Sequence, residues 1–213
     1  VVVAALMVVE VNSNGMMMLP IQRSSMFRDP RFPNATKNYD DNQLFCGGYQ
    51  RQWEQNGGKC GICGDAYDDP EPHPNEAGGT YASGIIVETY QQGSTINVTI
   101  RITANKKGYF FFKLCPNNDV NTKATQACLD QYELKVQAAD GTVSEKFFVD
   151  SSTGDKHLRV QLPPGLTCTQ CVLQWTYNAG NNWGCNASGS CCLGCGPQEN
   201  FVNCADIAIT TFG

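Results

Sequence analysis

The feature that most constrains the fold is an alternation of apolar and polar side chains in the segment 94–104. Apolar residues occupy every second position and polar residues lie between them: Ile96, Val98, Ile100 and Ile102 alternate with Asn97, Thr99, Arg101 and Thr103. Successive side chains of a β-strand point to opposite faces, whereas a helix repeats every 3.6 residues. The segment is therefore predicted to be a strand with one buried face.

Further segments have the composition of short strands and are separated by turn-rich sequence. They are SGIIVETY (83–90), GYFFFKLC (108–115), QYELKVQ (131–137), HLRVQLP (157–163), CVLQWTY (171–177) and ADIAITTF (205–212). At least seven short strands with this spacing predict an all-β fold, an antiparallel β-sandwich. Trp175, within one of these strands, is expected in the core.

The N-terminal third has a different character. From Met16 to Gly79 it is rich in Pro, Gly, Asn, Asp and Cys and has little strand periodicity. We interpret it as a long excursion that packs on the sandwich and is fixed by disulfides. Short helices are predicted near Asp40–Gln43 and Gly48–Gln55.

The composition excludes some classes of protein. Of the 213 residues, 41% are hydrophobic and 16% are charged, so the chain can form a core and does not have a disordered composition. The net charge is −5 and there is no run of lysines and arginines, so no nucleic-acid partner is predicted. The apolar stretch VVVAALMVV (1–9) is far shorter than the roughly 20 residues that span a bilayer, and no membrane partner is predicted.

That apolar stretch is typical of the hydrophobic region of a secretory signal peptide. Val11 and Ser13 supply small residues at positions −3 and −1, which predicts cleavage before Asn14. Residues 1–13 are therefore interpreted as a signal-peptide remnant, and 14–213 as a single secreted, extracellular domain. A buried N-terminal strand is the alternative interpretation.

The cysteines form an even set of twelve: Cys46, Cys60, Cys63, Cys115, Cys128, Cys168, Cys171, Cys185, Cys191, Cys192, Cys195 and Cys204. Three Cys-x-x-Cys pairs could suggest a zinc ribbon in a reducing compartment. The signal-like start favours six disulfides instead, with no structural zinc. One pairing, Cys115 with Cys128, is predicted because it would close a loop between two strands. Three N-glycosylation sequons agree with secretion, at Asn34, Asn97 and Asn186.

The residues that usually carry catalysis are sparse. His73 lies in a proline-rich loop and His157 on the outer face of a predicted strand, so both are expected in solvent and a histidine-rich metal site is not predicted. An acidic cluster lacks the spacing of a calcium loop and is interpreted as a solvated loop: Asp65, Asp68, Asp69 and Glu71. Aromatic side chains in loops are better candidates, because their rings can stack on sugars; these are Trp53, Trp183 and Tyr67, with Tyr49 and Tyr81.

Several motifs together resemble one family. They are RSSMFR (23–28), NYDDNQLFCGG (38–48), GKCGICGD (58–65), NEAGGTYASGIIV (75–87), ITANKKGYFFFKLCP (102–116), CTQCVLQWTYNAGNNWG (168–184) and CGPQENFVNCADIAI (195–209). In this order they resemble the lytic polysaccharide monooxygenases of auxiliary activity family fifteen, also grouped as chitin-binding type-4 domains. The resemblance implies an immunoglobulin/fibronectin III-like β-sandwich, secretion, and chitin or cellulose as the partner.

The resemblance also implies where chemistry would lie. The family binds copper in a histidine brace, in which the mature N-terminal histidine and a second histidine supply three nitrogens beside an axial aromatic ring. The N-terminal position falls on Asn14, the second on Lys106 in TANKKGYF, and the axial position on Phe201. A lysine ammonium has no lone pair at neutral pH, and an amide oxygen is a weaker copper donor than imidazole.

These residues predict a secreted, non-catalytic protein without a copper cofactor, a pseudoenzyme of the monooxygenase fold. It is expected to bind polysaccharide such as chitin or cellulose, or to serve as an extracellular structural component with matrix partners. One alternative is an active copper monooxygenase with unorthodox ligands. Another is a protein-interaction module on the same scaffold.

Overall fold

The computed structural model describes residues 14–211, and the predicted signal-peptide segment lies outside them. The strands are β1 (Asn14–Leu19), β2 (Glu88–Gln91), β3 (Thr95–Ala104), β4 (Tyr109–Cys115), β5 (Glu133–Gln137), β6 (Val143–Ser144), β7 (Phe147–Phe148), β8 (Gly154–Gln161), β9 (Cys168–Asn178), β10 (Trp183–Cys185), β11 (Cys191–Leu193) and β12 (Asn200–Thr210). The short helices are η1 (Arg23–Arg28), η2 (Gln50–Gln55) and α1 (Gln126–Leu129). No helix within 14–211 has the length and apolarity to cross a bilayer.

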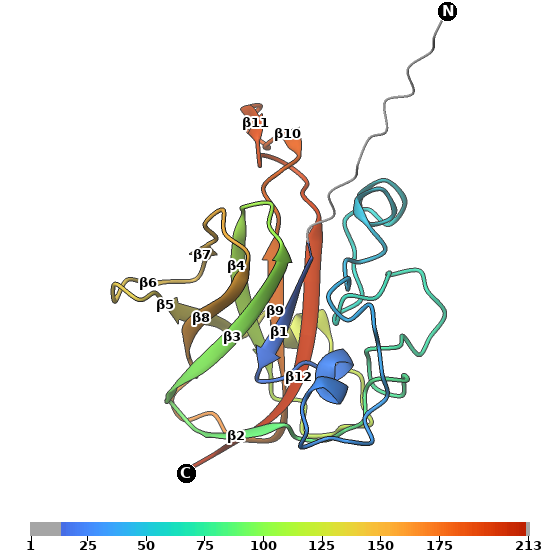
Figure 1. Ribbon diagram of the computed structural model, residues 1–213, viewed down its shortest axis with the longest axis vertical. Helices are drawn as coiled ribbons and strands as arrows, with labels where there is room; N and C mark the ends of the chain where they lie inside the picture. Colours follow the sequence, from blue (N-terminus) through green and yellow to red (C-terminus); the bar gives the residue numbers. More distant parts are fainter. Residues whose placement is uncertain (1–13, 212–213) are drawn as a thin grey trace, which may run out of the picture.

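The strands form a curled sheet with the order β1-β3-β8-β5-β4-β9-β12-β2 (Figure 1). The curl brings β1 against β12, where the backbone N–H of Met17 donates to Asn203 Oδ1 at 2.9 Å. The predicted β-sandwich is thus confirmed. Its pairs are antiparallel except for β2 with β12, which is parallel.

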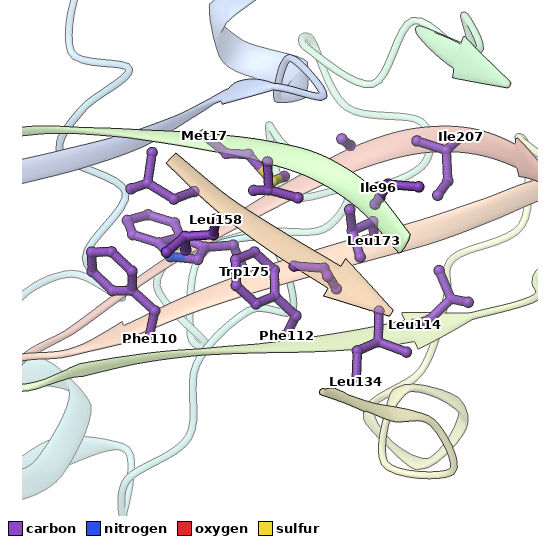
Figure 2. Packing of buried hydrophobic residues seen from close by; sticks show 14 of the residues in the cluster. Met17, Ile96, Phe110, Phe112, Leu114, Leu134, Leu158, Leu173, Trp175 and Ile207 are labelled. Carbon is purple, nitrogen blue, oxygen red and sulfur yellow. The ribbon is translucent and has the colours of Figure 1, made fainter. Parts of the chain in front are cut away.

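The core lies between the two layers of the curled sheet (Figure 2). The alternation in β3 is confirmed, because its four apolar side chains are buried, at 0–4% exposed. The predicted core position of Trp175 is also confirmed. Its ring meets that of Phe110 edge-on at 5.3 Å, and Phe110 meets Tyr177 in the same way at 5.1 Å.

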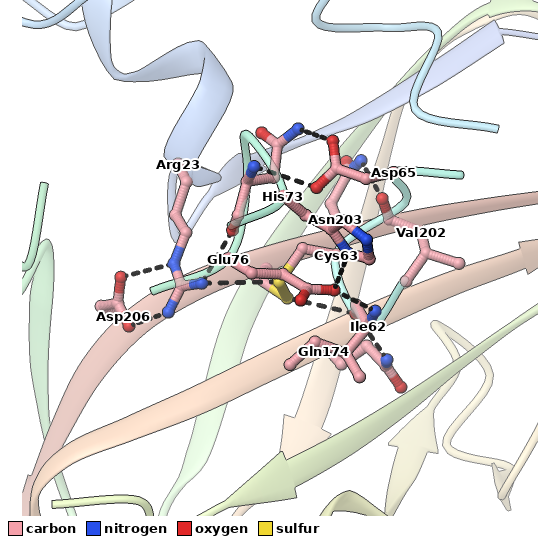
Figure 3. The surroundings of a disulfide bond; sticks show 12 residues. Arg23, Ile62, Cys63, Asp65, His73, Glu76, Gln174, Val202, Asn203 and Asp206 are labelled. Atoms are coloured by element: carbon pink, nitrogen blue, oxygen red, sulfur yellow. Dashed lines mark hydrogen bonds and ion pairs between the residues drawn. A yellow bond between two sulfur atoms is a disulfide. The ribbon is translucent and has the colours of Figure 1, made fainter. Parts of the chain in front are cut away.

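The six predicted disulfides are all present, and the pairing of Cys115 with Cys128 is confirmed. The others join Cys46 to Cys60, Cys63 to Cys204, Cys168 to Cys171, Cys185 to Cys191 and Cys192 to Cys195. The Cys63–Cys204 bond ties the N-terminal excursion to β12 (Figure 3). The excursion therefore covers the outer face of this strand.

The local elements agree with the predictions only in part. The helix predicted over Gly48–Gln55 is present as η2, but Asp40–Gln43 forms turns. There the carboxylate of Asp41 is buried and accepts hydrogen bonds from Ser25 Oγ and Arg28 Nε, each at 2.6 Å, which favours a turn over a helix. The strand predicted from residue 83 begins only at Glu88. Strand β1 was missed, because its methionine run has no alternation.

Candidate functional site

An open groove of about 1120 Å³ lies at the end of the sandwich where β3 stops and β4 begins. One wall is the excursion segment 45–50, and the opposite side is the β3–β4 loop with Ser151. The hairpin of β10 and β11 projects beyond this end (Figure 1). Its contributions to the lining are Trp183 and Leu193, and the preceding loop adds residues 180–182.

The three predicted brace positions lie towards this end of the molecule. Asn14 begins β1 and pairs with Ala104, two residues before Lys106. The backbone N–H of Lys106 donates to the hydroxyl of Tyr177 at 3.1 Å. The ring of Tyr177 in turn lies 5.8 Å from that of Phe201.

The side chain of Lys106 is held in the groove by an ion pair. Its Nζ lies 3.4 Å from Oε2 of Glu199, and the two side chains are only 16% and 10% exposed. The backbone of the loop is fixed separately, because the carbonyl of Lys106 accepts from the N–H of Gly180 at 3.0 Å. Lys107 adopts a left-handed conformation with φ of 58°, is exposed and also lines the groove.

Phe201 is buried and stacks on Phe45, with ring centroids 6.2 Å apart and an interplanar angle of 20°. Its hydrocarbon ring supplies no donor atom. Copper(II) is bound in proteins chiefly by nitrogen donors such as imidazole. None of the three positions supplies an imidazole: one holds a lysine ammonium paired with a carboxylate, one an asparagine and one a phenylalanine. These residues therefore do not fit a copper ion.

The two histidines lie outside the groove. His157 is exposed on β8, as predicted, with Nδ1 3.2 Å from Thr99 Oγ1. The prediction for His73 was wrong, because its side chain is buried at 2% exposed. Its burial is possible because Nδ1 lies 3.1 Å from Oε1 of Glu76, so that a charged ring has a carboxylate partner.

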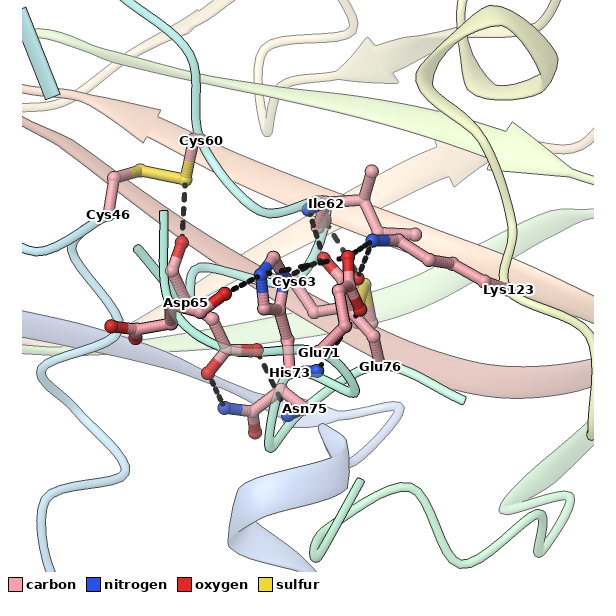
Figure 4. A network of polar contacts seen from close by, with 12 residues as sticks. Cys46, Cys60, Ile62, Cys63, Asp65, Glu71, His73, Asn75, Glu76 and Lys123 are labelled. Atoms are coloured by element: carbon pink, nitrogen blue, oxygen red, sulfur yellow. Dashed lines mark hydrogen bonds and ion pairs between the residues drawn. A yellow bond between two sulfur atoms is a disulfide. The ribbon is translucent and has the colours of Figure 1, made fainter. Parts of the chain in front are cut away.

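The predicted solvated acidic cluster is also partly wrong (Figure 4). Asp65 is buried, where its carboxylate accepts from the backbone N–H and the side-chain amide of Asn75 at 2.9 and 2.7 Å. Burial raises the pKa of Asp65, against the opposing effect of these hydrogen bonds. Asp68 and Asp69 both pair with Arg51 at 2.8 Å.

Asp65, His73 and Glu76 have potential ligand atoms within 4.8 Å of one another. However, both Glu76 oxygens are already engaged, Oε1 by the N–H of Ile62 and Oε2 by the ammonium of Lys123. The group is therefore a hydrogen-bonded ion-pair network and not a prepared metal centre.

The structure separates the three aromatic stacking candidates. Trp183 is 71% exposed, lines the groove and pairs across the hairpin with Leu193, which is 61% exposed. Trp53 is partly buried, and its Nε1 donates to the carbonyl of Gln198 at 2.8 Å. Tyr67 lies outside the groove lining, with Lys59 Nζ 5.1 Å from its ring centroid. All three sequon asparagines, Asn34, Asn97 and Asn186, are exposed.

Sequence reasoning missed two parts of the site. Glu199 lies 93 positions from its partner Lys106, so no local pattern connects them. The hairpin of β10 and β11 is not among the predicted strands, because each of its strands is only three residues long. The two adjacent disulfide pairs in CNASGSCCLGC were the available signal.

Comparisons with known proteins agree with this fold. The family model for "Lytic polysaccharide mono-oxygenase, cellulose-degrading" matches residues 15–207. A solved lytic polysaccharide monooxygenase AA15 from Thermobia domestica, in the Cu(I) state, is 48% identical, with a TM-score of 0.87 over 92% of this chain and 99% of that one. A chitin binding domain from Burkholderia pseudomallei shares the fold at 11% identity, with a TM-score of 0.54 over 93% and 100% of the two chains. No curated protein gave a significant match. By the extent of the family match and the identity to the Thermobia enzyme, this chain belongs to the lytic polysaccharide monooxygenase family.

Proposed function

We propose that this protein is a secreted, non-catalytic member of the family that binds polysaccharide, chitin or cellulose, through its groove and without copper. The ion pair between Lys106 and Glu199 carries the proposal. It puts a positive charge where the resemblance implies a neutral imidazole. The six disulfides fit the oxidising compartment that secretion implies.

The local electrostatics support the absence of a bound copper ion. An ammonium repels a divalent cation and offers it no lone pair. Glu199 could attract a cation, but its carboxylate lies beside the Lys106 ammonium at 3.4 Å. A metal ion bound by Glu199 would have to break this partly buried pair, which would leave the Lys106 ammonium as an uncompensated charge. The backbone contacts of the loop would remain.

The lining of the groove supports polysaccharide as the ligand. Amide side chains in its lining can exchange hydrogen bonds with sugar hydroxyls: Asn181 and Asn182. The exposed ring of Trp183 offers a stacking surface, and its hairpin is rigid because two disulfides close it. The two similar solved structures are a lytic polysaccharide monooxygenase and a chitin binding domain.

Copper binding by isothermal titration, in a chain processed to start at Asn14, tests the proposal. The unmodified chain is expected to show no tight Cu²⁺ binding and no oxidised sugars with reductant and peroxide. The double variant Asn14→His/Lys106→His should gain copper binding, whereas either change alone should gain little. Lys107→His is the matched control, because it adds a histidine next door without removing the ion pair.

Three outcomes would count against the proposal or its basis. Tight copper binding by the unmodified chain would favour an active enzyme with unorthodox ligands. No retention on insoluble chitin or cellulose would remove polysaccharide binding and favour the structural or protein-interaction role. Failure of a folded double variant to bind copper would show that Asn14 and Lys106 are wrongly aligned with the brace.

A further inference from the structure

The buried ring of His73 faces a hydrogen-bond acceptor at each nitrogen (Figure 4). Nε2 lies 3.2 Å from the backbone carbonyl oxygen of Asp69, and Nδ1 lies 3.1 Å from Oε1 of Glu76. A neutral imidazole has one N–H, so one of these acceptors would face a lone pair. Only the Nε2 contact has hydrogen-bond geometry, and its carbonyl acceptor places a proton on Nε2. The Nδ1 lone pair of a neutral ring would then lie 3.1 Å from the Glu76 carboxylate, whereas an imidazolium forms an ion pair with it, so the geometry favours the charged ring for a side chain that is 2% exposed.

We infer that His73 is a buried imidazolium that latches the loop 60–79 closed, and that loss of its proton at rising pH releases this loop. The latch is independent of the proposed ligand of the groove. It requires only that the ring exchange its proton with solvent when the loop opens.

The charged groups around the ring favour the proton. Glu76 is fully buried beside Nδ1, and Glu71 lies 3.8 Å from Nε2. The Lys123 ammonium bonds both carboxylates. Asp65 adds a third carboxylate to the cluster. With three carboxylates, one ammonium and a charged ring the cluster carries a net charge of −1, and with a neutral ring the charge becomes −2.

Several effects act on the pKa of His73 in opposite directions, and together they raise it. Burial lowers the pKa of His73, and the Lys123 charge lowers it further, but the close contact with Glu76 and the charges of Glu76 and Glu71 outweigh them and raise it. The closed loop thus binds the proton more tightly than the open loop does. Its stabilisation is complete below the ordinary histidine pKa of about 6.5, is lost as the pH rises towards the folded-state pKa, and is absent above it.

The latch connects to one wall of the groove. Glu76 Oε1 also accepts a hydrogen bond from the N–H of Ile62 at 2.8 Å, so it fixes the loop segment next to Cys63. Asp69, which receives the Nε2 bond, pairs through its carboxylate with Arg51 on η2. The contacts are tight, because a Cβ added to Gly61 would come within 2.9 Å of Glu76 Oε1 and 3.1 Å of His73 Nδ1. Opening is limited by the Cys63–Cys204 disulfide, which keeps the loop tethered.

The chain has only two histidines, so the signals of His73 can be assigned directly. In the unmodified, disulfide-bonded protein labelled with ¹⁵N-histidine, both nitrogens of His73 should remain protonated above the ordinary histidine pKa of about 6.5. Hydrogen exchange should then show reduced protection of amides in 60–79 as the pH rises, after correction for the intrinsic rate. The expected loss is roughly tenfold per pH unit between the open-state and closed-state pKa values. Amides of β9 should keep their protection.

Glu76→Gln should move the titration of His73 to lower pH, because it removes the main group that favours the proton. Glu71→Gln is the matched control, since this side chain is 57% exposed and should shift the titration less. If the Glu76 variant does not fold, the titration of the unmodified protein decides alone. A neutral single tautomer of His73 at pH 6, titration of His73 below about pH 6.5, or unchanged protection of 60–79 through the titration would each overturn the inference.

Discussion

The fork between Arg23 and Asp206 allows a quantitative prediction about how the excursion is held (Figure 3). Nε and Nη2 of Arg23 each lie 2.7 Å from a different carboxylate oxygen, and the side chains are 7% and 4% exposed. Nη1 also donates to the carbonyl of Asn75 at 2.8 Å. The amide of Gln170 donates to Asp206 Oδ1 at 2.7 Å.

Removal of one partner should cost far more than removal of both. Arg23→Met leaves a buried carboxylate with one donor, and Asp206→Leu leaves a buried guanidinium without its anion. Each should lower the free energy of unfolding by about 3–5 kcal/mol. In the double variant no charge is left unpaired. Its remaining cost is the lost hydrogen bonds of Asn75 and Gln170, at about 1–2 kcal/mol each, or about 2–4 kcal/mol in all.

Urea denaturation of the three variants with all disulfides intact provides the measurement. The double variant should be no less stable than either single variant. A constant m-value would show that the unfolded states are comparable. If the two single costs simply add in the double variant, to about 6–10 kcal/mol, the reasoning from paired burial is refuted. Small single costs, below about 1 kcal/mol, would refute the buried setting of the pair.

Two further predictions concern the surface. Trp183→Ala should weaken retention on chitin or cellulose by about 0.5–1.5 kcal/mol, a several-fold effect. Tyr67→Ala, which lies outside the groove lining, should leave retention unchanged. Equal effects of the two variants would contradict a specific role for the groove. The ammonium of Lys156, with help from Ser152, lowers the pKa of Asp150 to about 2. This pair therefore stabilises the fold above the ordinary aspartate pKa of about 3.9 and loses that effect as the pH falls towards 2; NMR titration should show a higher Asp150 pKa in Lys156→Met, and an unchanged value would contradict the assignment.

The alternation of apolar and polar residues is clearest where one face of a strand is buried and the other lies in solvent. In β3, solvent on one side and core on the other enforce alternation, so the pattern survives in the residues. In β9 both faces are covered, because the excursion packs outside it, and burial is continuous over 170–177 although Gln174 and Thr176 are polar. Strand β1 also lacks alternation. Its identity as a strand depends on its partner β3, which local sequence does not contain.

The candidate site shows a similar division. Asn14, Lys106 and Phe201 could be placed together only because a family resemblance supplied their relation; no spacing in the chain connects them. The partner of Lys106 needed the three-dimensional structure. His73 was misjudged because neighbouring prolines usually mark exposed loops, whereas here the buried carboxylate of Glu76 offsets the cost of burying the ring.

The loop that carries Lys106 keeps its shape through its backbone. Its N–H bonds Tyr177, its carbonyl bonds Gly180, and the side chain of Asn105 donates to the carbonyl of Asp150 at 2.9 Å. None of these contacts uses the Lys106 side chain, so the residue at 106 can change while the loop and the groove remain. A TM-score of 0.87 to a copper enzyme is therefore what this backbone would give with either a histidine or a lysine at this position. Similarity of fold cannot distinguish the two chemistries, because the difference lies in a few side chains on a shared scaffold.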